Sequence, residues 1–223
     1  MIDDNKYILD LIKNGEGLNV DFKHSVNNSK KIARSLAAFA NTEGGSLLLG
    51  VRDNGGIAGI SSDEEYYMIE TAALIFCKPP VEFTFKNWKI SGKNVMEIIV
   101  AKSDIGPHYA PDATGEFKAY VRNSDQNLIA NKILLEVWKR KKKDLAGIKI
   151  MFDDVVETLF KEIQENGSTT KSNFIRITGI KSTTADKLLA NLVLMNIIDF
   201  ELSEKSTKFV FNKEYFENNY LKK

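Results

Sequence analysis

The sequence predicts an α+β protein made of a mixed-sheet domain over residues 1–145 and a smaller domain over residues 146–223. Three observations carry this prediction. The segment "VEFTFKNWKI" alternates apolar and polar residues, as a half-buried strand does. The run "GGSLLLGV" is short, apolar and bounded by glycines, as a fully buried strand is, and helical patterns stand between such segments. After "KRKKKDLAG" the pattern changes to three helices followed by two β-rich segments.

The elements of the first domain follow from hydrophobic periodicity and turn residues. Apolar residues recur at helical spacing in four segments, and Asn28 or Ser29 provides an N-cap for the second of them. The Asn-Gly step of "DNGG" is a hairpin signal. We expect helices over 4–14, 28–41, 62–77 and 130–143, and strands at 19–23, "GGSLLLGV", "VEFTFKNWKI", "KNVMEIIVAKS" and "FKAYVRN".

The second domain contains helical patterns over 150–166, 171–178 and 182–196, followed by "IIDFEL" and "KFVFN", which the polar turn "SEKST" joins. Three helices and a two-stranded wing are the element order of a winged helix-turn-helix domain. The turn "TGIKST" has a glycine between the second and third helices, as such motifs commonly do. The sequence therefore predicts a winged helix. Its third helix should contribute core residues at Leu188, Leu189, Leu192, Val193 and Met195.

The composition bounds the class of protein. Hydrophobic residues make up 43% and charged residues 27% of the chain, as in a soluble globular protein, and no apolar run approaches the roughly 20 residues of a membrane span. Cys77 is the only cysteine, so we expect a buried thiol, no intramolecular disulfide and a cytoplasmic location. Two histidines and one cysteine cannot form a typical structural zinc site. A net charge of +1 leaves a nucleic-acid partner open.

The glycine-rich stretch "AFANTEGGSLLLGVRDNGGIAG", residues 38–59, raises the question of a phosphate-binding loop. It is not a P-loop, because no Gly-Lys-Ser/Thr step follows its glycines. The order helix, double glycine, strand also lacks the following helix whose N-terminus would bind an anion. The stretch therefore gives no support to nucleotide binding, and Gly44 and Gly45 are explained equally well as the stop between a helix and a buried strand.

Four ordered blocks, "GEGLNVDFKHS", "KKIARSLAAFANTEGGSLLLGVRDNGGIAGI", "PHYAP" and "AYVRNSDQN", together resemble the Schlafen AlbA-like domain family over about residues 5–140. The resemblance implies an α+β domain with a mixed sheet, described as DNA-binding in transcriptional regulators. Bacterial members frequently carry a C-terminal winged helix. An older family name, divergent AAA, implies ATP, so an ATP-binding regulator is a further alternative.

The resemblance also implies an enzymatic alternative, since some animal Schlafen proteins cut RNA with three acids. The matching positions are Glu16, Asp21 and Asp53, where converging carboxylates would hold Mg²⁺ or Mn²⁺ and activate water. Two differences from the family pattern stand against assigning these acids a catalytic role. Asp21 is one methylene shorter than the family's glutamate, and Arg52 occupies one of the two positions where the third acid could lie. Asp53 also begins a "DNGG" turn, where aspartate is common for local reasons.

Binding without cleavage requires only cations on one surface. In the first domain, basic residues flank the second helix and lie on the last strand, where Lys118, Tyr120 and Arg122 share one face. The alternative is that these basic side chains are exposed to solvent at separate positions and do not form one binding surface. The candidates for phosphate contacts here are Lys23, Lys30, Lys31, Arg34, Lys118 and Arg122.

In the winged helix, the N-terminal end of the third helix is the end that enters a major groove. It carries short hydroxyls suited to phosphates or base edges, and lysines of the wing can reach a neighbouring backbone. The candidates are Ser182, Thr183, Thr184 and Lys187 on the helix and Lys205 and Lys208 on the wing. The alternative is a winged helix used for protein contact or dimerisation.

The function that the sequence favours is a nucleic-acid-binding protein, a bacterial transcriptional regulator that binds DNA. The partner is DNA or RNA, a homo-oligomer such as a dimer is expected, and no cofactor is expected unless the nuclease alternative holds. The alternatives are a metal-dependent endoribonuclease of Schlafen type and an ATP-binding regulator.

Overall fold

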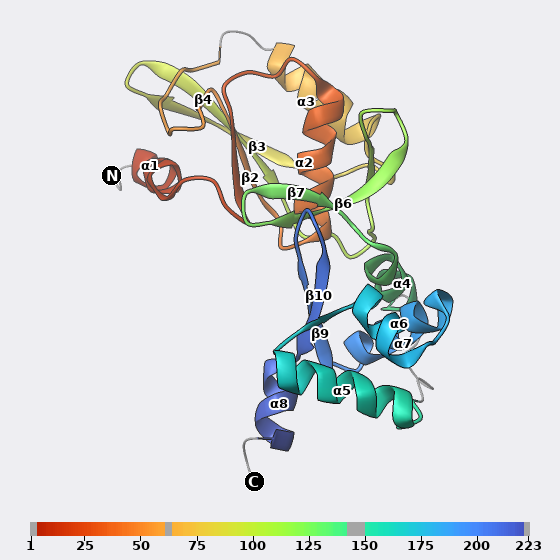
Figure 1. Ribbon diagram of the computed structural model, residues 1–223. Coiled ribbons are helices and arrows are strands. Elements are labelled where there is room, and N and C mark those ends of the chain that lie inside the picture. Colours follow the sequence, from red (N-terminus) through yellow and green to blue (C-terminus); the bar gives the residue numbers. More distant parts are fainter. Residues whose placement is uncertain (1–3, 61–63, 142–149, 221–223) are drawn as a thin grey trace. The chain divides into compact units, whose positions relative to one another are not determined.

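The computed structural model describes residues 4–60, 64–141 and 150–220 and confirms an α+β protein. The chain forms two compact units, residues 1–130 and 131–223 (Figure 1). The boundary thus lies before helix α4 (Lys132–Lys141) rather than after residue 145. The reason is packing: Ile133 and Val137 of α4 belong to the hydrophobic core of the second unit.

The first unit contains a mixed four-stranded sheet in the order β1-β2-β4-β3. Strand β1 (Val20–Lys23) is parallel to β2 (Gly45–Leu49), whereas β4 (Lys93–Val100) is antiparallel to both β2 and the edge strand β3 (Thr84–Ile90). A second, antiparallel sheet has the order β5-β6-β7. Its strands are β5 (Tyr109–Pro111), β6 (Phe117–Asn123) and β7 (Gln126–Ile129). Of these three strands, the sequence pattern predicts only β6.

Two helices cover opposite faces of the four-stranded sheet. Leu47 and Leu49 of β2 join the core around α2 (Ser29–Asn41), whereas Leu48 joins a separate core with Ile8 of α1 (Asp4–Asn14). Burial on both faces explains the uninterrupted apolar run of β2. Helix α2 also packs against the second sheet (Figure 1).

The ends of two helices in this unit can be compared with the sequence patterns. Asn28 is the N-cap of α2, as expected, and its side chain accepts a hydrogen bond from Lys31 N over 3.1 Å. Helix α3 (Glu64–Leu74) ends three residues earlier than the expected 62–77, and residues 62 and 63 lie outside the described part of the chain.

The second unit places helices around a small antiparallel sheet of order β8-β10-β9 (Figure 1). Met195, expected in the core, is 41% exposed because it lies at the C-cap of α7. Strand β8 and helix α8 were not anticipated. After α4 the elements are α5 (Asp154–Asn166), β8 (Thr169–Thr170), α6 (Lys171–Thr178), α7 (Ser182–Leu194), β9 (Ile198–Leu202), β10 (Thr207–Phe211) and α8 (Lys213–Tyr220).

Within the described residues, none of the helices combines the length and the apolar character that crossing a membrane requires.

Candidate nucleic-acid interface

Asp21 is the centre of a buried polar network in the first unit. Asp21 on β1 and Arg122 on β6 are each 4% exposed. Arg122 Nη2 lies 3.3 Å from Asp21 Oδ1, and Lys23 Nζ lies 3.1 Å from Asp21 Oδ2. The Ser35 hydroxyl on α2 donates to Asp21 Oδ2 over 3.1 Å, and Asn127 Nδ2 on β7 donates to Ser35 Oγ over 2.9 Å. The network therefore joins β1 and α2, which are neighbours in the sequence, to the hairpin of β6 and β7, which lies much later in the chain.

Glu16 shares a hydrogen bond with Asp21, and the pKa values of the two carboxyls move in opposite directions. Burial raises the pKa of Glu16 and the Asp21 carboxylate raises it further, while the 2.7 Å hydrogen bond from Phe22 N partly offsets this. Burial also raises the pKa of Asp21, but Lys23, the Glu16 hydrogen bond and Arg122 together hold it below its ordinary value. When the pair holds one proton, the proton therefore resides on Glu16.

The expected acidic triad is only partly assembled. Glu16 and Asp21 meet, but Asp53 is exposed in the turn after β2. Among the described residues, no cluster of three or more histidine, cysteine or acidic side chains is placed to hold a metal ion. Both oxygens of Asp21 also face cationic groups already. This donor set does not fit Mg²⁺ or Mn²⁺, because the positive charges of Lys23 and Arg122 beside Asp21 would repel a metal ion.

Arg122, a candidate for phosphate contacts, is occupied by the protein itself. Its Nε donates to Gly17 O over 3.0 Å, its Nη2 to Val20 O over 3.0 Å and its Nη1 to Asn127 Oδ1 over 3.1 Å. The guanidinium carbon lies 5.2 Å from the centroid of the Phe39 ring. A buried arginine with this set of partners supports the fold rather than a surface for ligands.

The other candidate cations of the first unit divide into engaged and exposed ones. Arg34 Nε donates to Pro111 O over 2.8 Å, and Lys118 Nζ lies 2.5 Å from Glu116 Oε1. Lys30 and Lys31, at the start of α2, are exposed. Lys30 Nζ lies 5.7 Å from the centroid of the Phe76 ring, and neither lysine forms an ion pair with a described residue, so these two remain the most available of the predicted contacts in this unit.

The glycine-rich stretch is explained by packing. A Cβ on Gly45 would lie 2.5 Å from the Phe39 ring, and one on Gly44 would lie 2.7 Å from Val100 O. Asn41 Nδ2 donates to the carbonyls of His108 and Tyr120 over 2.8 and 2.9 Å. The stretch thus ties α2 to both sheets, and its glycines permit close approach.

One basic and aromatic surface was not anticipated. A shallow hollow of about 540 Å³ on the edge strand β3 is lined by Lys86, Trp88 and Lys89 together with two asparagines. Tyr7 of α1 lies beside it, with its ring centroid 5.7 Å from that of Trp88. Lysines beside aromatic rings are suited to single-stranded nucleic acid. The lysines and the tryptophan stand in "TFKNWKI", whose alternation predicts only a strand.

In the second unit, all the predicted contact residues are at the surface. On α7 these residues occupy the first two turns, and Lys181, the N-cap, makes no side-chain capping bond. The wing candidates lie on the turn between β9 and β10 and on β10 itself. The exposed residues are Ser182, Thr183, Thr184, Lys187, Lys205 and Lys208.

The rest of the outward face of α7 is covered by α4. Leu194 is 8% exposed and Ala190 is fully buried, although they lie about 140° and 100° around α7 from the buried Leu189. Ile133 and Val137 of α4 belong to the same core, and α4 and α7 pack along their lengths. Only the first two turns of α7 therefore remain open to a partner.

Residues 16–131 match the model of the family described as Schlafen, AlbA_2. No curated protein matches the chain at a significant level. Among solved structures, the chain is similar to the DIP2311 protein of Corynebacterium diphtheriae, with 15% identity and a TM-score of 0.43, over 87% of this chain and 34% of that one. It is also similar to the N-terminal domain of a RecG-related protein from Nitrosomonas europaea, with 22% identity and a TM-score of 0.39, over 55% of this chain and 94% of that one.

Proposed function

The chain belongs to the Schlafen AlbA_2 family, and on that premise we propose that it is a nucleic-acid-binding protein, a bacterial transcriptional regulator that contacts DNA through its second unit. One observation carries the proposal. All six predicted contact residues on α7 and the β9–β10 hairpin are exposed, in an element order that matches a winged helix.

The order α5, β8, α6, α7, β9, β10, with β10 between β8 and β9, supports this proposal, because a winged helix has three helices followed by a two-stranded hairpin. In such a domain the N-terminal turns of the third helix approach the major groove. The hydroxyls of Ser182, Thr183 and Thr184 suit phosphate or base-edge contacts, and Lys187 adds a cation. Because α4 covers the remainder of α7, base contacts are confined to these first turns.

The alternatives receive less support. A metal-dependent nuclease requires three converging acids, and Asp21 instead pairs with Lys23 and Arg122. An ATP-binding regulator requires a phosphate loop, and the glycines of residues 38–59 serve close packing.

Fluorescence anisotropy with labelled duplex DNA over a series of salt concentrations tests the proposal. The variant K187A/K205A/K208A should bind more weakly, and the slope of log K against log salt should fall by about 3, since each phosphate contact contributes about 0.9. The control K139A/K161A/K213A removes the same charge from exposed positions elsewhere on the second unit. Equal weakening by both variants, or no salt-sensitive binding of the wild type, refutes this assignment.

RNA serves as the second arm of the same measurement. Labelled single-stranded RNA should bind less tightly than duplex DNA and should be insensitive to K187A/K205A/K208A. If RNA binds more tightly and K86A/K89A weakens it, the surface on β3 is the interface instead.

We also propose a homodimer, because winged-helix regulators commonly bind two half-sites with two copies. Sedimentation equilibrium measures the mass directly. A mass of about 25.1 kDa at the concentrations used for DNA binding would correspond to the monomer and refute this part of the proposal.

A further inference from the structure

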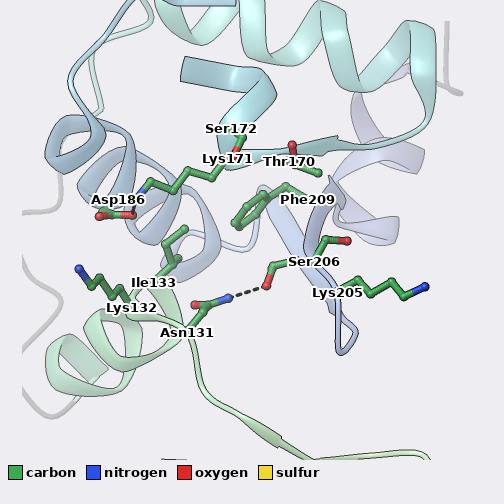
Figure 2. A pocket seen from close by; sticks show the side chains of 11 residues that line it. Asn131, Lys132, Ile133, Thr170, Lys171, Ser172, Asp186, Lys205, Ser206 and Phe209 are labelled. Atoms are coloured by element: carbon green, nitrogen blue, oxygen red, sulfur yellow. Dashed lines mark hydrogen bonds and ion pairs between the residues drawn. The ribbon is translucent and has the colours of Figure 1, made fainter. Parts of the chain in front are cut away.

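The second unit contains a hollow of about 330 Å³ that the DNA proposal does not use as a whole. Four segments bound it: the start of α4, the junction of β8 and α6, the first half of α7 and the β9–β10 hairpin (Figure 2). All of them belong to the same compact unit. The volume is within the range of sites for small organic molecules.

The charge of the lining is predominantly positive. Lys132, Lys171 and Lys205 line the hollow, and Asp186 is the one acidic residue there. Lys171 and Asp186 form an ion pair on one wall, which neutralises the carboxylate (Figure 2). Lys132 and Lys205 have no carboxylate partner among the residues that the structure describes, so their charges remain in excess.

The two unpaired lysines flank the hollow from opposite sides. Figure 2 shows their side chains extending outward from its rim, one from α4 and the other from the hairpin. Both residues are exposed, so rotation about their side-chain bonds can bring the ammonium groups over an anion in the hollow. A divalent anion there would draw charge from both sides.

Hydroxyl and amide groups supply donors between the lysines. The Thr170 hydroxyl caps α6 by accepting from Asn173 N over 3.2 Å, and Ser172 is exposed beside it. Asn131 caps α4 through Leu134 N over 2.8 Å and donates to Thr207 Oγ1 over 2.8 Å. This second contact fixes the start of α4 against the hairpin, so the frame of the hollow is held in place.

From this lining we propose that the hollow is a phosphate-binding site that takes the phosphoryl group of a small organic phosphate or of the DNA backbone. Two lysines and several hydroxyls, the kinds of group that bind phosphate in proteins, line the hollow together. The DNA source rests on the proposed function, since Lys205 is also a wing contact. The small-molecule source does not.

Titration of the ¹⁵N-labelled protein with phenyl phosphate, followed by NMR, tests the small-molecule source. Amide shifts should be saturable and confined to the residues around the hollow, and phenol, which lacks the phosphate, should cause none. Inorganic phosphate should shift the same amides more weakly. The K132Q variant should raise the apparent dissociation constant about tenfold, and K139Q, at the exposed far end of α4, should leave it unchanged.

The DNA source is tested with the same variants and duplex DNA. If the hollow takes a backbone phosphate, K132Q weakens DNA binding while K139Q does not. Phenyl phosphate binding without any DNA binding would refute the proposed function and leave the site standing. If phenyl phosphate shifts no amide at the hollow and K132Q binds DNA like the wild type, the site is refuted, even if DNA binding itself is established.

Discussion

Replacing Arg122 by methionine is the sharpest test of the distinction between a scaffold residue and a ligand contact. The guanidinium makes four polar contacts of 3.0 to 3.3 Å inside the first unit. Methionine keeps much of the volume over Phe39 but leaves Asp21 without one of its two cations and removes the arginine's hydrogen bond to Gly17 O, whereas Val20 O keeps its hydrogen bond from Gly17 N. Removing one partner of a buried ion pair costs about 3–5 kcal/mol.

Urea denaturation followed by circular dichroism measures this cost. K118M is the matched control, because Lys118 lies on the same strand and its pair with Glu116 is more exposed, so its loss should cost no more than about 1 kcal/mol. A double-mutant cycle with D21N adds a second check. The double variant should be destabilised by less than the sum of the two single variants, since each single change leaves the other group unpaired.

A different outcome would contradict this reasoning. If R122M unfolds at nearly the same urea concentration as the wild type but no longer binds nucleic acid, Arg122 is a ligand contact, as the sequence pattern had suggested. The two outcomes are separable because stability and binding are measured on the same protein preparations.

Three further predictions concern groups in the first unit. The pKa of Asp21 is lowered in the fold, so its carboxylate stabilises the protein above about pH 4, and this stabilisation is lost as the pH falls; D21N should therefore flatten the acid limb of a stability–pH profile. The pKa of Glu16 is raised, so its contribution to stability is present below about pH 4.3 and is lost as the pH rises through its folded pKa. E16Q should therefore be neutral or stabilising at pH 7. G45A should lose about 1–3 kcal/mol in urea denaturation, since the new methyl meets a buried aromatic ring, while G17A, with nothing within 4 Å, should lose nothing; equal losses would contradict the packing explanation. Burial raises the pKa of Cys77 to about 12, so Ellman's reagent at pH 8 should label it only after unfolding, and rapid labelling of the native protein would show an accessible thiol.

The sequence predicted the elements that have a strong local pattern. The buried strand β2, the helix that Asn28 caps and the hairpin of β3 and β4 all have periodicity or turn residues that decide them without tertiary contacts. Strands β5, β7 and β8 have only a few residues each, and they are strands because they form hydrogen bonds with neighbouring strands. In these three segments, no alternation of apolar and polar residues distinguishes a strand from a loop.

The assignment of α4 to a unit was beyond local patterns for a different reason. Its apolar stripe of Ile133, Leu134 and Val137 predicts an amphipathic helix but does not say which core the stripe joins. The charged run that follows suggested a boundary after the helix, whereas the contacts place the boundary before it. A charged run in the sequence indicates a segment exposed to solvent, whereas the end of a hydrophobic core can be found only from the contacts between side chains.

The candidate site shows the same limit for charged side chains. Parity along β6 correctly placed Lys118, Tyr120 and Arg122 on one face, yet it could not tell that this face turns toward α2 and β1, where Arg122 meets a carboxylate. A charged residue on a strand has the same pattern whether its partner is a phosphate in solution or an aspartate in the core. Burying the arginine with Asp21 in the first unit removes it from ligand contact, and the exposed lysines at the start of α2 and on β3 remain as candidates there. Lys132 on α4 and Lys205 on the hairpin are therefore the stronger candidates for phosphate, because neither lysine forms an ion pair with a carboxylate in the described part of their own unit.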